Sequence, residues 1–283
     1  GFDRSVEVYY HLTEEADQVT FEFMDATGTV ISSYESLAEG EEDEEEEGGF
    51  DFFGAGSEHP ATSAGANTFA WSMREEGWTD FEDRIFWAAG NVGPAVLPGE
   101  YQVRITVDGE SHTRDFEIRM NPRAAAEGVT MADLRERYDF ASRIRDRVSE
   151  ANEAVIRIRD LKGQVDERLE ETDNTEVEET GETVKGRLTG VEEEIYQTQS
   201  ESSQDPLNFP IRLNNKLAAL LNQVEGAENQ PTDQSYEVYE VLSEELGEEL
   251  EQMQLIIRQD VARLNRLLRE EGLPPIDADR LIS

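Results

Sequence analysis

Apolar and polar positions alternate in short runs before about residue 122. In the clearest run, 99–108, the apolar side chains at positions 101, 103, 105 and 107 are separated by polar ones. A period of two puts successive side chains on opposite faces, so this run predicts a β-strand. Shorter β-branched and aromatic runs predict further strands at 5–10, 19–24, 28–34, 68–73 and 112–120. With no helical period among them, these strands predict an immunoglobulin-like β-sandwich over residues 1–122.

The apolar period lengthens to between three and four residues after residue 122. Apolar side chains from Leu134 to Leu169 recur with a mean step of about 3.5, which predicts one helix of some 40 residues beginning near Thr130. The polar stretch 170–182 predicts a loop. Further seams predict helices at 182–200 and 211–224, and a long last helix that Thr232 caps and Gly272 ends. We therefore expect an antiparallel bundle of three to four helices over 123–283, and an α+β protein of two domains.

An acidic insertion interrupts the predicted strands at 39–49. Eight carboxylates stand close together here and are flanked by glycine, so their mutual repulsion predicts a solvated loop. Clustered carboxylates are also ligands for hard cations, which makes weak cation binding the alternative. The run lacks the alternating ligands of a calcium loop, and this argues against a specific site. The weak cation-binding candidates are Glu41, Glu42, Asp43, Glu44, Glu45, Glu46 and Glu47.

A second insertion, 75–97, is rich in aromatic residues. Exposed Trp78 and Trp87 would suit stacking against sugar rings, because a β-sandwich is a common scaffold for carbohydrate-binding modules. The simpler interpretation is that these rings cover one end of the sandwich or pack against a neighbouring domain. The accessibility of the rings distinguishes the two interpretations.

Charge changes the picture more than any motif does. The chain has 65 acidic against 25 basic residues and a formal net charge of -40. Such a charge opposes compaction, so we expect a halophilic protein whose self-repulsion is screened where the Debye length falls to about 3 Å at 1 M salt. Nucleic acids and anionic membrane surfaces would repel it.

No catalytic or metal-binding constellation emerges from the sequence. The chain lacks cysteine, and its three histidines, His11, His59 and His112, share no metal-ligand spacing. The acidic runs Glu192–Glu194 and Glu244–Glu245 could ligate a di-iron centre only beside a Glu-x-x-His motif, and the second half has no histidine. Nucleophile-elbow, zinc-protease and phosphate-loop motifs are absent. We therefore expect no enzymatic activity, cofactor or bound metal.

One segment resembles a known family. Residues 196–220, and within them Gln204–Asn215 above all, resemble the C-terminal region of large bacterial BNR-repeat proteins, which are sortilin-like or sialidase-like β-propeller proteins often labelled glycosyl hydrolases. The Pro-Gly-x-Tyr hairpin at 98–109 is similar to that of the Ig-like domain in the same tails. The repeated Asp-box of a propeller is missing, so any activity would belong to a propeller outside this chain. The resemblance implies a C-terminal portion of an exported protein that is secreted, periplasmic or on the cell surface.

The leading functional hypothesis is a non-catalytic structural or interaction module. It would brace its own propeller domain or mediate assembly with other protein subunits in high salt. The alternative is a carbohydrate-binding accessory region that uses Trp78 and Trp87. The start at Gly1 has no signal region, so we expect a cytosolic protein or a mature or truncated piece. Pro206 and Pro210 break the helix within Gln204–Asn215. We expect Asn208, Asn214 and Asn215 to hydrogen-bond free backbone groups around this proline-broken connection, and a ligand pocket there is the alternative.

Overall fold

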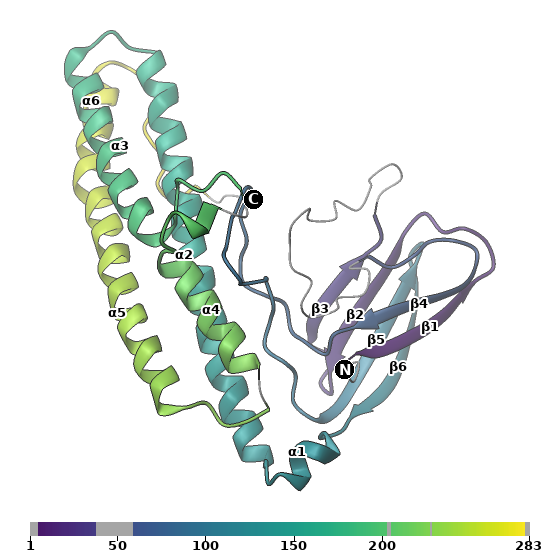
Figure 1. Ribbon diagram of the computed structural model, residues 1–283. Helices are drawn as coiled ribbons and strands as arrows, with labels where there is room; N and C mark the ends of the chain where they lie inside the picture. Colours follow the sequence, from purple (N-terminus) through teal and green to yellow (C-terminus); the bar gives the residue numbers. More distant parts are fainter. Residues whose placement is uncertain (1–4, 38–58, 203–204, 227, 281–283) are drawn as a thin grey trace. The chain divides into compact units, whose positions relative to one another are not determined.

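The protein is α+β, with two antiparallel sheets in its N-terminal part and helices in its C-terminal part (Figure 1). The computed structural model describes residues 5–37, 59–202, 205–226 and 228–280. The acidic insertion 39–49, with the cation-binding candidates Glu41–Glu47, lies outside these described residues. Each of the six strands expected from the sequence is present.

The strands pair in two sheets. In the smaller sheet β1 (Val6–Leu12) pairs with β4 (Gly65–Trp71). The larger sheet has the order β3-β2-β5-β6, and its strands are β2 (Val19–Asp25), β3 (Val30–Glu35), β5 (Gly99–Val107) and β6 (Glu110–Ile118). The β5–β6 hairpin turns at Asp108 and Gly109, whose φ angles are 47° and 88°. An Asp-Gly pair with both φ values positive matches the twist of the flanking strands, which fixes their register.

Both sheets contribute to one aromatic core. Phe21 and Phe23 of β2 and Trp71 of β4 are fully buried. The rings of Phe23 and Trp71 stack with centroids 4.2 Å apart. The alternation read from the sequence places these side chains on one face of each strand, and their burial removes a large apolar area from water.

The helical part contains one helix of the predicted length and one that begins earlier than predicted. Helix α2 (Met131–Glu170) spans 40 residues. Helix α3 spans Thr175–Ile195, so the predicted loop at 170–182 is confined to 171–174 and the predicted helix bounds 182–200 are wrong. Asn174 caps α3 by accepting hydrogen bonds from the backbone N–H groups of the first turn. Gly181 lets α3 approach α2 closely, because a Cβ there would lie 2.8 Å from a methyl carbon of Leu169.

The remaining helices follow the predicted order with one irregularity. The seam from Tyr236 to Leu268 predicts one helix, but a π-helical turn, η2, interrupts it. A π-turn adds a residue to the helical ring and shifts the following side chains around the axis. The bounds are α1 (Pro122–Ala126), α3 (Thr175–Ile195), η1 (Asp205–Leu207), α4 (Leu213–Glu225), α5 (Asp233–Ile256), η2 (Ile257–Val261) and α6 (Ala262–Glu270).

The chain forms two compact units whose segments interleave along the sequence. Unit 1 is Gly1–Gly77, Gly90–Ser142 and Gln223–Pro231, and unit 2 is Trp78–Ala89, Arg143–Asn222 and Thr232–Ser283. The sequence predicts one domain boundary, at residue 122. In the structure the chain passes from one unit to the other five times, at 77/78, 89/90, 142/143, 222/223 and 231/232. Among the described residues, the helices are all too short or too polar to cross a membrane.

Candidate functional site

The aromatic insertion supplies part of the helical unit. Its segment Trp78–Ala89 belongs to unit 2, and backbone groups of Thr79 bond to α2. The Thr79 carbonyl accepts from the Asn152 amide at 2.8 Å, and the Thr79 N–H donates to the Ser149 hydroxyl at 3.0 Å. Because Trp78–Ala89 has no regular secondary structure, these side chains satisfy backbone groups that would otherwise lack partners.

The end of the same segment is held by α4. Asn215 accepts from the Trp87 N–H at 2.7 Å and donates to the Trp87 carbonyl at 3.1 Å. Its neighbour Asn214 donates to Asn152 at 3.0 Å, and both of these amides are fully buried. The expected structural role of Asn214 and Asn215 is thus seen, although Asn215 bonds to Trp87 rather than to the proline-broken connection. Asn208 is exposed.

A tyrosine from the end of α3 fixes the middle of the segment. The Tyr196 hydroxyl accepts from the Ile85 N–H at 3.1 Å and donates to the Asp83 carbonyl at 3.3 Å. The Phe81 ring meets the Tyr196 ring edge to face with centroids 5.0 Å apart, and the Arg159 guanidinium lies 4.9 Å from the Phe81 centroid. Aromatic and cation–π contacts of this kind hold the segment against α2 and α3.

The two tryptophans proposed as sugar-stacking residues have different environments. Trp78 is 3% exposed, and its ring packs 6.3 Å from that of Phe86. Trp87 is 41% exposed. A sugar ring stacks only on an accessible face, so only Trp87 retains the property that the carbohydrate hypothesis needs.

Buried carboxylates in each unit are neutralised by cations. In unit 2, Glu192 accepts from Arg159 and from Lys162, each at 2.9 Å, and its side chain is 4% exposed. In unit 1, Glu225 accepts from Arg74 at 2.7 Å and from the Ala95 N–H at 3.0 Å. Pairing offsets the cost of removing a charge from water. The part of the chain that the structure describes contains no group of three or more His, Cys, Asp or Glu residues able to hold a metal ion.

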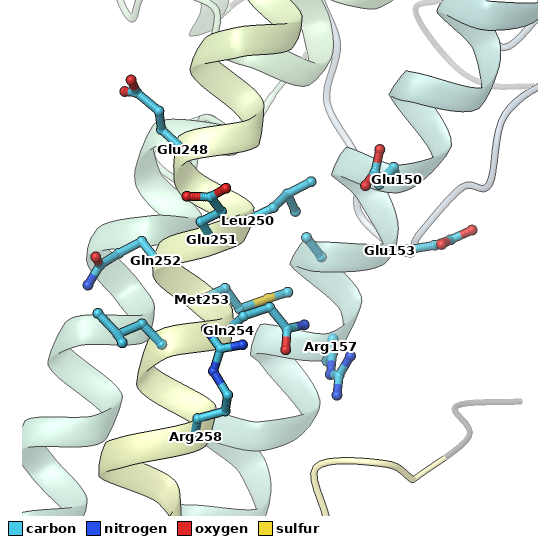
Figure 2. A pocket seen from close by; sticks show the side chains of 12 residues that line it. Glu150, Glu153, Arg157, Glu248, Leu250, Glu251, Gln252, Met253, Gln254 and Arg258 are labelled. Carbon is cyan, nitrogen blue, oxygen red and sulfur yellow. The ribbon is translucent and has the colours of Figure 1, made fainter.

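A groove of about 740 Å³ lies between α2 and α5 within unit 2 (Figure 2). Met253 and Ala154 are buried at its floor, and Leu250 and Leu255 are partly exposed along it. The remaining lining side chains are polar or charged: Glu150, Glu153, Arg157, Glu248, Glu251, Gln252, Gln254 and Arg258.

Two contacts show that α2 and α5 run parallel. The Arg143 guanidinium lies 5.0 Å from the centre of the Tyr239 ring, and one turn later Arg147 donates to the Ser243 carbonyl at 2.5 Å. Both pairs are 96 residues apart in sequence, so each step along α2 is matched by an equal step in the same direction along α5. The groove begins after these two arginines.

The groove opens because a small residue follows the two arginines on the same face of α2. The long side chains of Arg143 and Arg147 reach from α2 to α5. Two turns beyond Arg147 the corresponding position is Ala154, which has no side chain long enough to fill the space. Arg143 and Arg147 fill the space between the two parallel helices. Ala154 does not fill it two turns later, so a groove is left there.

Charges are sorted along the groove. On α2, Glu150 and Glu153 precede Arg157. On the facing helix, Glu248 and Glu251 of α5 precede Arg258 of η2. Since the helices are parallel, the carboxylates gather towards one end and the guanidinium groups towards the other, as Figure 2 shows. Arg157 is held in place by donating to the Ala278 carbonyl at 2.6 Å.

The basic end of the groove coincides with the π-turn. Arg258 belongs to η2, and the neighbouring Asp260 pairs with Arg187 of α3. π-turns inside helices occur often at functional sites, because they re-aim side chains that a regular helix would point elsewhere. Mixed Glu and Arg on the outer face of a helix is also typical of ordinary solvation, so the charges alone do not indicate a site. The available signal was the small residue Ala154 two turns after Arg147, beside a matching order of Glu and Arg on two helices.

Comparison of the sequence with family models and with curated proteins, and of the structure with solved structures, finds no match.

Proposed function

We propose that this chain is a non-catalytic interaction module whose two units are braced against independent unfolding. The observation that carries the proposal is the interleaving of the chain between the units, which places Trp78–Ala89 in unit 2 while its flanking segments belong to unit 1. The chain leaves unit 1 after Gly77, contributes twelve residues to unit 2 and returns to unit 1 at Gly90. The segment Trp78–Ala89 is therefore joined covalently to unit 1 at both of its ends.

Each unit holds the segment that arrives from elsewhere in the sequence with buried polar contacts. In unit 2 the donors and acceptors are Asn152, Asn215 and Tyr196. In unit 1 the arriving segment is 223–231, and its Glu225 bonds to Arg74 and Ala95. A buried group that loses such a partner costs about 1–3 kcal/mol, so these contacts resist local detachment.

The broader setting of the proposal rests on the sequence. The six strands and their shared aromatic core support an immunoglobulin-like sandwich. The helices support a bundle in which α3 runs antiparallel to α2 and α5, while α2 and α5 run parallel to each other. The resemblance of 196–220 to the tails of BNR-repeat proteins supports a role beside a β-propeller in an exported protein. The charge of -40 supports operation in concentrated salt.

Calorimetry tests the bracing. In about 2 M KCl we expect the wild-type chain to unfold in one transition. Asn215→Ala removes both bonds to Trp87 and should broaden or split that transition, whereas Asn208→Ala, at an exposed position, should leave it unchanged. Two independent transitions in the wild-type chain would contradict the proposal.

Carbohydrate binding remains the second candidate because Trp87 is exposed. Its affinity would depend on one accessible ring rather than two, since Trp78 is buried. A glycan array probed with the wild-type chain and with Trp87→Ala tests this function. Glycan signals that persist unchanged in Trp87→Ala, or that are absent from the wild-type chain, would count against it.

A further inference from the structure

We propose that the groove between α2 and α5 binds an amphipathic helix of a partner protein, with basic residues in the first half of that helix and acidic residues in its last turns. This inference rests on the proposed role as an interaction module and names the surface that acts. It commits to a partner whose charge order is complementary to the groove.

The shape of the groove favours a helix. Two parallel helices bound a longitudinal furrow, and Ala154, Leu250, Met253 and Leu255 supply its apolar floor. A helix binds such a furrow through residues spaced three and four apart, which form one continuous apolar stripe. A third helix laid along the furrow would cover this floor.

The charges fix the direction of the bound helix. Glu248 and Glu251 mark one end, and Arg157 and Arg258 mark the other. A helix carries partial positive charge at its N-terminus and partial negative charge at its C-terminus. Its N-terminal half therefore belongs at the glutamates and its C-terminal turn at the arginines, so that it runs parallel to α2 and α5.

Several of these charges are available to a partner. Glu248, Glu251 and Arg258 are exposed and make no hydrogen bond or ion pair to the residues that the structure describes. Glu150 and Glu153 are already engaged with Arg147 and Thr79, and Arg157 with Ala278. Glu150, Glu153 and Arg157 therefore maintain the shape of the groove. The exposed Glu248, Glu251 and Arg258 are the groups that can pair with opposite charges on the partner helix.

In concentrated salt, apolar groups and charged groups contribute differently to binding of the partner helix. At about 1 M salt the Debye length is only about 3 Å, so only charges in direct contact still discriminate. Apolar burial is not screened and supplies most of the affinity. Binding should therefore persist at high salt, while the preference for one charge order should fall as salt rises.

Two synthetic peptides test the proposal with the full chain. Both form an 18-residue amphipathic helix with the same leucine stripe and composition. One has lysine in its first half and glutamate in its last turns, and the other has the reverse order. Fluorescence anisotropy, at the lowest KCl concentration at which circular dichroism shows the chain folded, should show the first peptide binding at least tenfold more tightly. Equal affinities would overturn the proposed charge order.

Two variants locate the binding. Ala154→Met narrows the groove and should weaken binding of the first peptide at least tenfold. The double variant Glu251→Lys with Arg258→Glu should reverse the peptide preference, while its matched control, Glu240→Lys with Arg269→Glu, changes the same charges on exposed positions outside the groove and should not. The double variant keeps the test valid if Ala154→Met fails to fold.

Three results would overturn the proposal. One is binding that neither groove variant alters, and another is the absence of binding by either peptide. The third is self-association of the wild-type chain that Ala154→Met abolishes, because it would make a second copy the occupant. The proposed function is tested separately by calorimetry of the wild-type chain. A single unfolding transition would support that function whatever the peptides do, and two independent transitions would contradict it.

Discussion

The amide of Asn214 donates to the side-chain oxygen of Asn152 at 3.0 Å, and both side chains are fully buried. Asn152 in turn donates to the Thr79 carbonyl, so the pair links α4, α2 and the segment Trp78–Ala89 in one chain of hydrogen bonds. Buried polar groups linked in this way specify one arrangement of the elements, because any shift leaves a donor or acceptor without a partner.

Removal of one member of this pair should destabilise the protein. Asn214→Ala leaves the Asn152 oxygen buried without this donor, and we expect the free energy of unfolding to fall by about 1–3 kcal/mol. Guanidinium denaturation of Asn214→Ala and of the exposed control Asn208→Ala, in the same salt, measures the difference. Equal losses in the two variants would show that the buried pair contributes nothing specific.

Two glycines of α3 should respond in opposite ways to alanine. At Gly181 a Cβ would lie 2.8 Å from a Leu169 methyl, and overpacking of this kind costs about 1–3 kcal/mol. At Gly186 the added Cβ meets nothing within 4 Å, so the better helix propensity of alanine should stabilise by up to about 1 kcal/mol. Thermal unfolding of the two variants tests the close packing of α3. A stabilised Gly181→Ala would contradict it.

Glu249 should weaken the fold when it ionises. Partial burial raises its pKa, and the nearby charges of Glu194 and Glu248 raise the pKa further. A carboxyl group with a raised folded-state pKa stabilises the fold below its ordinary pKa of 4.5, and this contribution is lost as pH rises through the folded-state pKa. Glu249→Gln removes the charge, so its stability relative to wild type should increase as pH rises from 4 towards 7.

The matched control for this prediction is Glu245→Gln, an exposed carboxyl on the same helix. Urea denaturation at several pH values and at low and high salt measures both variants. High salt should reduce the advantage of Glu249→Gln, because salt screens repulsion from Glu194 and Glu248. An advantage that does not change with pH would argue against ionisation as its cause.

The whole chain should depend on salt for its folded state. A net charge of -40 is repulsive at low ionic strength, so dilution should expand or unfold the protein and several molar KCl should restore it. Circular dichroism across a salt series tests this, and helicity and melting that do not vary with salt would contradict it. Deletion of Glu41–Glu47 should barely alter the melting temperature in high salt, and a large loss would contradict the solvated-loop interpretation.

Local patterns anticipated the regular elements well. Alternation gave the strands, because one face of each must reach the aromatic core formed by residues such as Phe23 and Trp71. The seam from Leu134 to Leu169 predicted α2 nearly to the residue. The start of α3 was missed because its first turns are polar and contain Gly181, and their burial depends on packing against Leu169 and Val165 of the preceding helix, which the local pattern does not show.

The candidate site was far less predictable. The order Glu150, Glu153, Arg157 is visible in the sequence, but it acquires meaning only beside Glu248, Glu251 and Arg258 on a parallel helix. Trp78 is buried and Trp87 is exposed, although both lie in the same aromatic-rich segment of the sequence. Periodicity reports which face of an element is apolar and does not report what that face meets.

The sequence by itself determined the α+β class of the protein and most of its strands and long helices, because these follow from the local spacing of apolar residues. Only the tertiary structure decided that Trp78–Ala89 joins the helical unit and that α2 and α5 enclose a groove. Both depend on contacts between residues 60 or more positions apart, such as Asn152 with Thr79 and Arg147 with Ser243, and no local pattern encodes such pairings.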